Sequence, residues 1–172
     1  MRALRLVLSF EPEAEGTAVE LLGRAMELAP QDPLPLALAA WCHGLRAGHH
    51  FTEKPEAERE RARNLIGRAE SLGYHDSLTE TLLAAGQTLS GDLATAAVHV
   101  ERALMSDGGS SWAWGRSGWI EAYSARTESA IERLQIARGL AIDDRPSEFP
   151  LGNWDRGSAF RGRPVRGSDP LV

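Results

Sequence analysis

The chain has 172 residues with a formal net charge of −5 at pH 7, and hydrophobic residues make up 42% of it, which suits one domain or a short repeat array with a buried core. The acidic balance argues against a general nucleic-acid surface or a polybasic membrane surface. A single cysteine, Cys42, excludes an intramolecular disulfide framework and suits the reducing cytoplasm, where we expect the protein, and no apolar run reaches the roughly 18 residues of a membrane span.

The N-terminal segment, MRALRLVLSF, contains a short apolar stretch. Two interpretations are open, a signal peptide and an amphipathic helix. Arg5 interrupts the stretch and no small-residue cleavage site follows it, so we favour the helix.

Apolar periodicity and turn signals predict a chain made of helices throughout its first 141 residues. Segments such as APQDP at 29–33, SLGYHD at 71–76 and SDGGSS at 106–111 mark the points at which helices stop. We expect helices near residues 2–10, 14–29, 33–48, 55–72, 76–89, 92–105, 110–124 and 127–141.

A comparison of the chain with itself reveals a repeat of 34 residues. Four segments share a helical face of small and aliphatic residues, namely Ala18, Leu22 and Ala25; Ala62, Ile66 and Ala69; Ala96, Val100 and Ala103; and Ala130, Leu134 and Ala137. The last three segments are 34 positions apart, whereas the first precedes the second by 44. The spacer HHFTEKPEAE therefore carries an insertion. The preceding helices share the same offsets in the pairs Ala39-Ala40, Leu83-Ala84 and Ser117-Gly118.

Each repeat unit is predicted to be a pair of antiparallel helices. Small residues at fixed positions let the two backbones approach closely, and larger aliphatic residues fill the remaining gaps. One pair cannot bury its apolar face alone, so stacked neighbours complete the core. We expect an array over residues 1–145, in which the first unit is truncated because its leading helix starts almost at Met1. The units lie near 1–30, 33–73, 76–106 and 110–142.

A 34-residue helix pair of this composition resembles the tetratricopeptide repeat. That family has an aromatic residue early in the first helix and a small residue four positions later, a pattern that Trp114 and Gly118 match. Leu36 and Ala40 match it weakly, and the closing proline survives only as Pro30. The resemblance implies an all-α, right-handed solenoid of about four helix pairs, with Trp114 in its core.

More narrowly, LALAAWCHGLRAGHHF and SSWAWGRSGWIEAY resemble the C-terminal repeats of bacterial multidomain regulators. In those proteins the repeats follow an adenylate cyclase-like catalytic domain or a winged-helix DNA-binding domain. Neither the metal-binding aspartates of the cyclase nor the winged helix can be placed in this sequence, so neither activity is implied.

The resemblance also implies that the first helix of each pair lines a concave groove. The residues expected to bind a partner there are Leu34, Trp41, Leu45, Leu78, Thr81, Trp112, Arg116, Trp119 and Tyr123. Aromatic residues and arginine dominate binding hot spots. For Trp41 and Trp119 two interpretations stay open, a place in the groove and packing between helices.

The leading hypothesis for function is therefore an interaction module that holds an unknown protein or peptide. The alternative is a remnant of a multidomain signalling regulator, cyclase-like or transcriptional, that lacks its output domain. We expect no enzyme, no cofactor, and neither nucleic acid nor membrane as a partner.

Side chains that could carry metal or catalytic chemistry do not form a recognisable motif. Cys42 and His43 are adjacent on one helix and point about 100° apart, and with His49 and His50 they do not give zinc spacing. We predict surface histidines and a small buried thiol. There is no nucleophile elbow and no phosphate loop, and acidic pairs such as Glu58 and Glu60 are expected on solvated helix faces.

The last residues differ in character, because from Pro150 the chain has no helical period and carries four Arg against two Asp. One interpretation is a flexible basic tail that touches an acidic partner or nucleic acid. We favour another: plausible GC-rich codons for 153–172, read one base later, encode residues typical of a further repeat. Residues 146–172 would then be a frameshifted remnant, and an uncapped terminal repeat would leave an apolar surface open to self-association.

Overall fold

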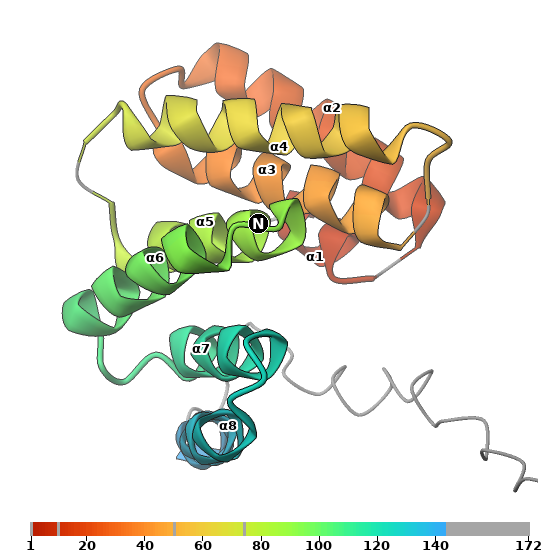
Figure 1. The fold of residues 1–172 in the computed structure, drawn as a ribbon. Helices are drawn as coiled ribbons and strands as arrows, with labels where there is room; N and C mark the ends of the chain where they lie inside the picture. The colour runs from red at the N-terminus through yellow and green to blue at the C-terminus, as the bar shows by residue number, and fades with distance from the viewer. Residues whose placement is uncertain (1, 10, 50, 74, 144–172) are drawn as a thin grey trace, which may run out of the picture.

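The computed structural model describes residues 2–9, 11–49, 51–73 and 75–143, and this part of the chain is all-α and contains no strand (Figure 1). Every predicted helix is present, with ends that move by at most three residues. The predicted tail at 146–172 lies outside the described residues. The helices are α1 (Arg2–Val7), α2 (Pro12–Leu28), α3 (Pro33–Gly48), α4 (Pro55–Glu70), α5 (Ser77–Ser90), α6 (Leu93–Ser106), α7 (Ser111–Tyr123) and α8 (Thr127–Asp143).

Side-chain caps explain where several helices begin. The carboxylates of Asp32, Asp76 and Asp92 each accept a hydrogen bond from a backbone N–H in the first turn of α3, α5 and α6, which satisfies a donor that the helix itself leaves free. The hydroxyl of Ser110 does the same for α7. Gly91 ends α5 in the left-handed conformation, with φ of 92°, where a side chain would be strained.

The 34-residue repeat appears directly in the helix positions. Helices α5 and α7 begin at Ser77 and Ser111, and α6 and α8 begin at Leu93 and Thr127, so both pairs are 34 positions apart. The small residues of the repeat lie at equivalent buried positions of α2, α4, α6 and α8, namely Ala18, Ala62, Ala96 and Ala130. The spacing that was found in the sequence therefore corresponds to one recurring packing position.

The helices pack mainly against their neighbours in chain order, and the pairs follow one another in space from α1–α2 to α7–α8 (Figure 1). Helix α3 packs against α2, α4 and α5, and the main hydrophobic core lies among these helices. Leu4 and Val7 of α1 also belong to this core. A smaller apolar cluster formed by Ala84, Val100 and Ile120 joins α5, α6 and α7. The described helices include none that is long and apolar enough to cross a membrane.

Close backbone approach is most marked between α7 and α8. A Cβ atom added at Gly118 would lie 2.6 Å from Cγ of Leu134 and 3.2 Å from the carbonyl oxygen of Ala130. These distances are too short for a side chain at this position, so the pair of helices requires glycine there. The small residues that define the repeat are thus needed for packing.

Part of the insertion within the second unit, between α3 and α4, forms an extra helical turn. Helix α4 begins at Pro55, whereas an offset of 34 from Leu93 would start it at Arg59. Glu58 lies in this added turn and is buried, with 4% of its surface exposed. Its carboxylate contacts His43 and Arg46 of α3, so polar contacts attach the inserted turn to the preceding helix.

Candidate functional site

The predicted groove residues lie on α3, α5 and α7 but differ widely in exposure. Trp41, Leu45 and Thr81 are buried, with 3%, 5% and 3% of their surfaces exposed. Five others are half-buried, namely Leu34, Leu78, Trp112, Arg116 and Trp119. Tyr123 is 58% exposed. The accessible part of the predicted face is therefore concentrated on α7.

The structure brings the largest of these side chains together in what we call the aromatic–arginine cluster, which consists of Trp41, Trp112, Arg116, Trp119 and Tyr123. The indole rings of Trp41 and Trp112 meet edge to face, with centroids 5.7 Å apart and an interplanar angle of 79°, an arrangement that aromatic quadrupoles favour. The Arg116 guanidinium lies 5.9 Å from the centroid of the Trp41 ring, within the range of a cation–π contact.

Helical spacing explains how α7 supplies four of the five residues. Trp112, Arg116, Trp119 and Tyr123 follow at intervals of four, three and four positions, so they share one face of the helix. The rings of Trp119 and Tyr123 lie 6.0 Å apart. Helix α5 packs against both α3 and α7 and carries Thr81 at a predicted groove position.

Arg116 is the only charged member of the cluster, and its surroundings are unusual for an arginine. Its Nε is buried and has no hydrogen-bond partner among the described residues. Burial lowers the pKa of the guanidinium to about 10, while the nearby Tyr123 phenol acts in the opposite direction. The positive charge thus lies against aromatic rings, and no carboxylate of the described residues forms an ion pair with it.

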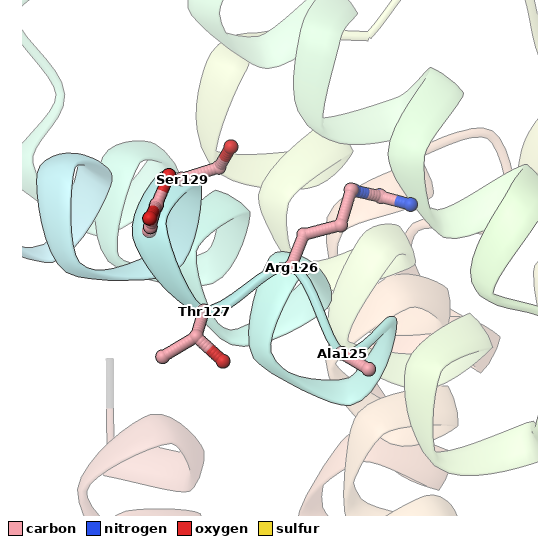
Figure 2. Close-up of a pocket in the computed structure, with 5 residues that line it drawn as sticks. Ala125, Arg126, Thr127 and Ser129 are labelled. Atoms are coloured by element: carbon pink, nitrogen blue, oxygen red, sulfur yellow. The ribbon is translucent and has the colours of Figure 1, made fainter.

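A separate depression lies at the turn between α7 and α8. Figure 2 shows Arg126, Thr127 and Ser129 around it, with Ala125 beside them. Arg126 is engaged by the carboxylate of Glu121, and no histidine or cysteine lines the depression. It is an open polar surface formed by one short segment, and it contains no pairing of a nucleophile with a base.

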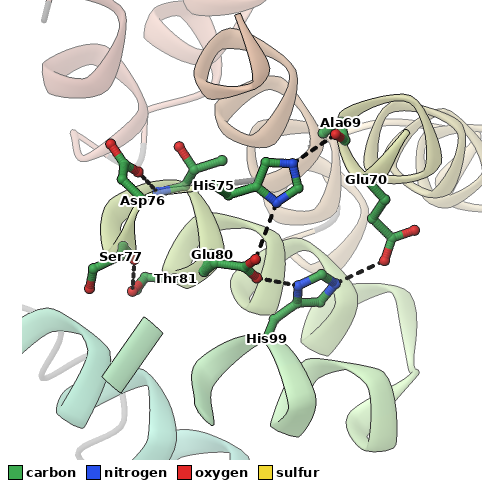
Figure 3. A network of polar contacts seen from close by, with 9 residues as sticks. Ala69, Glu70, His75, Asp76, Ser77, Glu80, Thr81 and His99 are labelled. Atoms are coloured by element: carbon green, nitrogen blue, oxygen red, sulfur yellow. Dashed lines mark hydrogen bonds and ion pairs between the residues drawn. The ribbon is translucent and has the colours of Figure 1, made fainter. Parts of the chain in front are cut away.

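The most extensive buried polar arrangement is the histidine–glutamate network, which consists of Glu70, His75, Glu80 and His99 (Figure 3). Glu80 contacts His99 Nδ1 at 2.6 Å and His75 Nδ1 at 3.2 Å. His99 Nε2 lies 3.0 Å from the carboxylate of Glu70, and His75 Nε2 lies 2.8 Å from the carbonyl oxygen of Ala69. The network therefore joins α4, α5, α6 and the segment between α4 and α5.

The number of donors and acceptors constrains the hydrogen bonds of this network. Each of the four contacts needs one proton, and a carbonyl or ionised carboxylate oxygen can only accept. Two neutral imidazoles supply two protons. The four contacts therefore cannot all be hydrogen bonds while both carboxylates are ionised and both imidazoles are neutral. Burial alone would raise the pKa of Glu80, but the hydrogen bonds and charges of His99 and then His75 outweigh it and lower the pKa.

The expectation that Glu58 lies on a solvated helix face is wrong. Its carboxylate contacts His43 Nδ1 at 2.5 Å, Arg61 at 2.8 Å and Arg46 at 3.4 Å. Burial raises the pKa of Glu58, but the His43 hydrogen bond and the neighbouring positive charges lower it overall. His43 is correspondingly half-buried, so it is not a free surface histidine.

A second buried carboxyl has no such partners. Glu15 of α2 is fully buried, and neither of its carboxyl oxygens has a hydrogen-bond partner among the described residues. Burial raises its pKa to about 7, and the charge of Arg46 opposes the shift. The predicted buried thiol of Cys42 lies beside this segment, with Sγ 3.7 Å from the Glu15 carbonyl oxygen. Burial is also the main cause that raises the pKa of Cys42 to about 12, so the thiol is unreactive.

Neither Glu15 nor Cys42 belongs to a group of described side chains that could hold a metal ion. In the described part of the chain, no three His, Cys, Asp or Glu side chains are placed to hold a metal ion. His49 is exposed, and His50 lies outside the described residues. The nitrogen atoms of His75 and His99 already face oxygen partners inside the protein. His75 and His99 therefore connect neighbouring helices through these contacts.

Sequence patterns could have indicated only part of this arrangement. His99 lies between Ala96 and Val100 on the buried face of the repeat, so its spacing was a signal of burial. His75 follows a turn segment and has no periodic signal. Trp114, predicted as core, is half-buried, and its indole N–H donates to the Gly108 carbonyl while Arg133 lies over its ring.

Comparison with models of known protein families gives no match for this chain. Comparison with curated proteins gives no match either.

Proposed function

We propose that the chain is a tetratricopeptide-type solenoid that binds a peptide or protein partner through the face formed by α3, α5 and α7. The support for the architecture is the 34-residue spacing of the helices themselves, together with Ala62 and Ala96 at equivalent buried positions of α4 and α6. Stacked helix pairs of this kind gain a continuous core from their neighbours and leave the first helix of each pair along one face.

The observation that carries the proposal is the aromatic–arginine cluster. It places Trp112, Arg116, Trp119 and Tyr123 on one face of α7, and each of them retains accessible surface. Tryptophan, tyrosine and arginine are the residues that contribute most to binding energy at protein interfaces. An apolar face with one cation is suited to an extended or helical segment of a partner.

Trp41 of α3 lies beneath the α7 side chains of this face. It is buried, and it contacts both the Trp112 ring and the Arg116 guanidinium. A side chain that is already ordered before a partner arrives loses little conformational entropy on binding. Trp41 therefore acts as a positioning residue, and the contact with a partner is made by the α7 side chains.

Selection of peptides tests the proposal directly. The full chain is immobilised and used to select from a phage-displayed library of random peptides, and selected peptides are then titrated against soluble protein by fluorescence anisotropy. We expect a consensus rich in apolar residues whose binding is weakened at least 10-fold by Trp119→Ala, the size of effect typical of a hot spot.

Met105→Ala is a matched control, because Met105 is 88% exposed on α6 and lies outside the proposed face. It should bind the selected peptides as the unmodified protein does. Failure to select any peptide, or equal weakening by both substitutions, contradicts binding at the α7 face.

A further inference from the structure

Arg116 of the proposed face carries a positive charge for which the described residues provide no carboxylate partner. The other half-buried arginines of the described chain have carboxylate partners, as Arg46 has in Glu58, Arg59 in Glu56 and Arg133 in Glu121. Arg116 has instead the Trp41 ring below it and a buried Nε without a hydrogen-bond partner among the described residues. A buried donor that stays unsatisfied destabilises the folded state, and more so when it is charged.

The predicted groove positions offer Arg116 no carboxylate partner. The residues at the predicted groove positions of α3, α5 and α7 include no aspartate or glutamate. Apart from Arg116 and Thr81, they are aromatic or aliphatic. A partner with a negative charge would therefore meet a single cation in an otherwise uncharged surface, and no neighbouring carboxylate would repel it.

From this charge complementarity we infer that the partner is a peptide segment with one internal Asp or Glu side chain, which pairs with the Arg116 guanidinium, between apolar residues that cover Trp112 and Trp119. The inference rests on the proposed function, because it names the chemistry of the partner at the same face. An arginine fork can bind both oxygens of a carboxylate at once, which combines charge with geometric selection.

The position of the cation along α7 favours an internal residue over a chain end. Arg116 lies between Trp112 on one side and Trp119 and Tyr123 on the other. A partner with its terminal carboxylate on Arg116 would cover only one of these two sides. A segment that continues past its acidic residue can cover both, and it gains the apolar contacts of each.

The test uses the selected peptides after synthesis with an acetylated N-terminus and an amidated C-terminus, so that the only carboxylate is that of the internal residue. Replacing this Asp or Glu by Asn or Gln should weaken binding to the full chain by about 10- to 100-fold, as expected for the loss of a hydrogen bond to a charged group. The Arg116→Gln protein should show the same weakening for the acidic peptide. It should show no further loss for the amide peptide.

Two more proteins make the result specific. Arg116→Lys keeps the charge without the planar fork, so it should recover only part of the affinity. Arg138→Gln removes an exposed arginine of α8 and should leave the affinity unchanged. Because the key comparison changes the peptide and not the protein, it does not depend on the stability of an Arg116 variant.

Several outcomes overturn the inference while the proposed function stands. These are selected peptides without an acidic residue, binding that needs a free C-terminal carboxylate, and equal effects of the Asp-to-Asn change on the unmodified and Arg116→Gln proteins. In each case Trp119→Ala still weakens binding. If no peptide binds the unmodified chain, both the inference and the proposed function are wrong.

Discussion

The α5–α6 and α7–α8 helix pairs begin at equivalent positions of the 34-residue repeat. The side chains between the two helices of each pair nevertheless differ in chemistry. Glu80 and His99 form a buried polar contact between α5 and α6. The residues 34 positions later are Trp114 and Arg133, which form a half-exposed cation–π contact between α7 and α8.

The same comparison extends to the apolar positions. Val100 of α6 is 2% exposed, whereas its equivalent in α8, Leu134, is 37% exposed. Among the described helices, α5–α6 has neighbours on both sides and α7–α8 has a neighbour on one side only. The repeat therefore determines which side of its helix a residue occupies. Whether that side is buried depends on the presence of a neighbouring helix pair.

Removing the buried charge should give the largest effect. Glu80→Ala leaves His75 and His99 without the carboxylate that connects them, so we expect a loss of about 3–5 kcal/mol in the free energy of unfolding, measured by urea denaturation at pH 7. A loss below about 1 kcal/mol would mean that the histidine–glutamate network does not hold the helices together.

A second substitution at Glu80 tests the pH dependence of stability. The folded pKa of Glu80 is lowered from 4.5, so its stabilising contribution is complete above the unfolded pKa and is lost as the pH falls through the folded pKa. Glu80→Gln should remove this part of the acid destabilisation. If Glu80→Gln loses stability at low pH as much as the unmodified protein does, Glu80 is not the cause of this loss.

Glu15 should give a pH dependence of the opposite sign. Its folded pKa is about 7 against 4.5 in the unfolded chain, so the folded state binds the extra proton between these values. Stability should therefore fall as the pH rises from 4.5 to 7, by up to about 3 kcal/mol. Glu15→Gln should abolish this decline and stabilise the protein at pH 8. Denaturation series at several pH values measure it, and a decline that survives the substitution assigns it to another group.

A substitution at Gly118 tests the close packing of α7 on α8, and the same substitution at Gly139 serves as its control. Gly118→Ala forces Leu134 and the backbone of α8 to move, and we expect a loss of about 1–3 kcal/mol. Gly139→Ala, on α8 with nothing within 4 Å of an added Cβ, should instead stabilise the helix by up to about 1 kcal/mol. Thermal denaturation of both proteins decides the point, and equal effects would exclude a packing cause.

The smallest effect is expected at the cation–π position. Arg133→Gln removes the contact with the Trp114 ring and a hydrogen bond to Ser117, and about a third of the Arg133 side chain is exposed, 32%. We expect a loss of about 1 kcal/mol or less. A loss as large as that of Glu80→Ala would contradict the view that the outer pair tolerates polar change better than the inner pair.

Much of the fold could be predicted from the chain alone. The positions of the helices and the recurring burial of Ala62, Ala96 and Ala130 follow from local periodicity, because a helix aligns residues three and four positions apart whatever surrounds it. The grouping of Trp112, Arg116, Trp119 and Tyr123 on one face of α7 follows from the same spacing. The tetratricopeptide assignment and the groove as a binding site stay predictions.

Only the tertiary structure decided how charge and burial are distributed. Glu15, Glu58 and Glu80 are ordinary acidic residues in sequence, yet one is buried alone and two are buried with partners from other helices. Likewise, Trp41 meets Trp112 only because α3 and α7 both pack against α5. The physical reason is that desolvation and pairing depend on atoms contributed by distant segments, whereas helical periodicity depends on the residues of one segment.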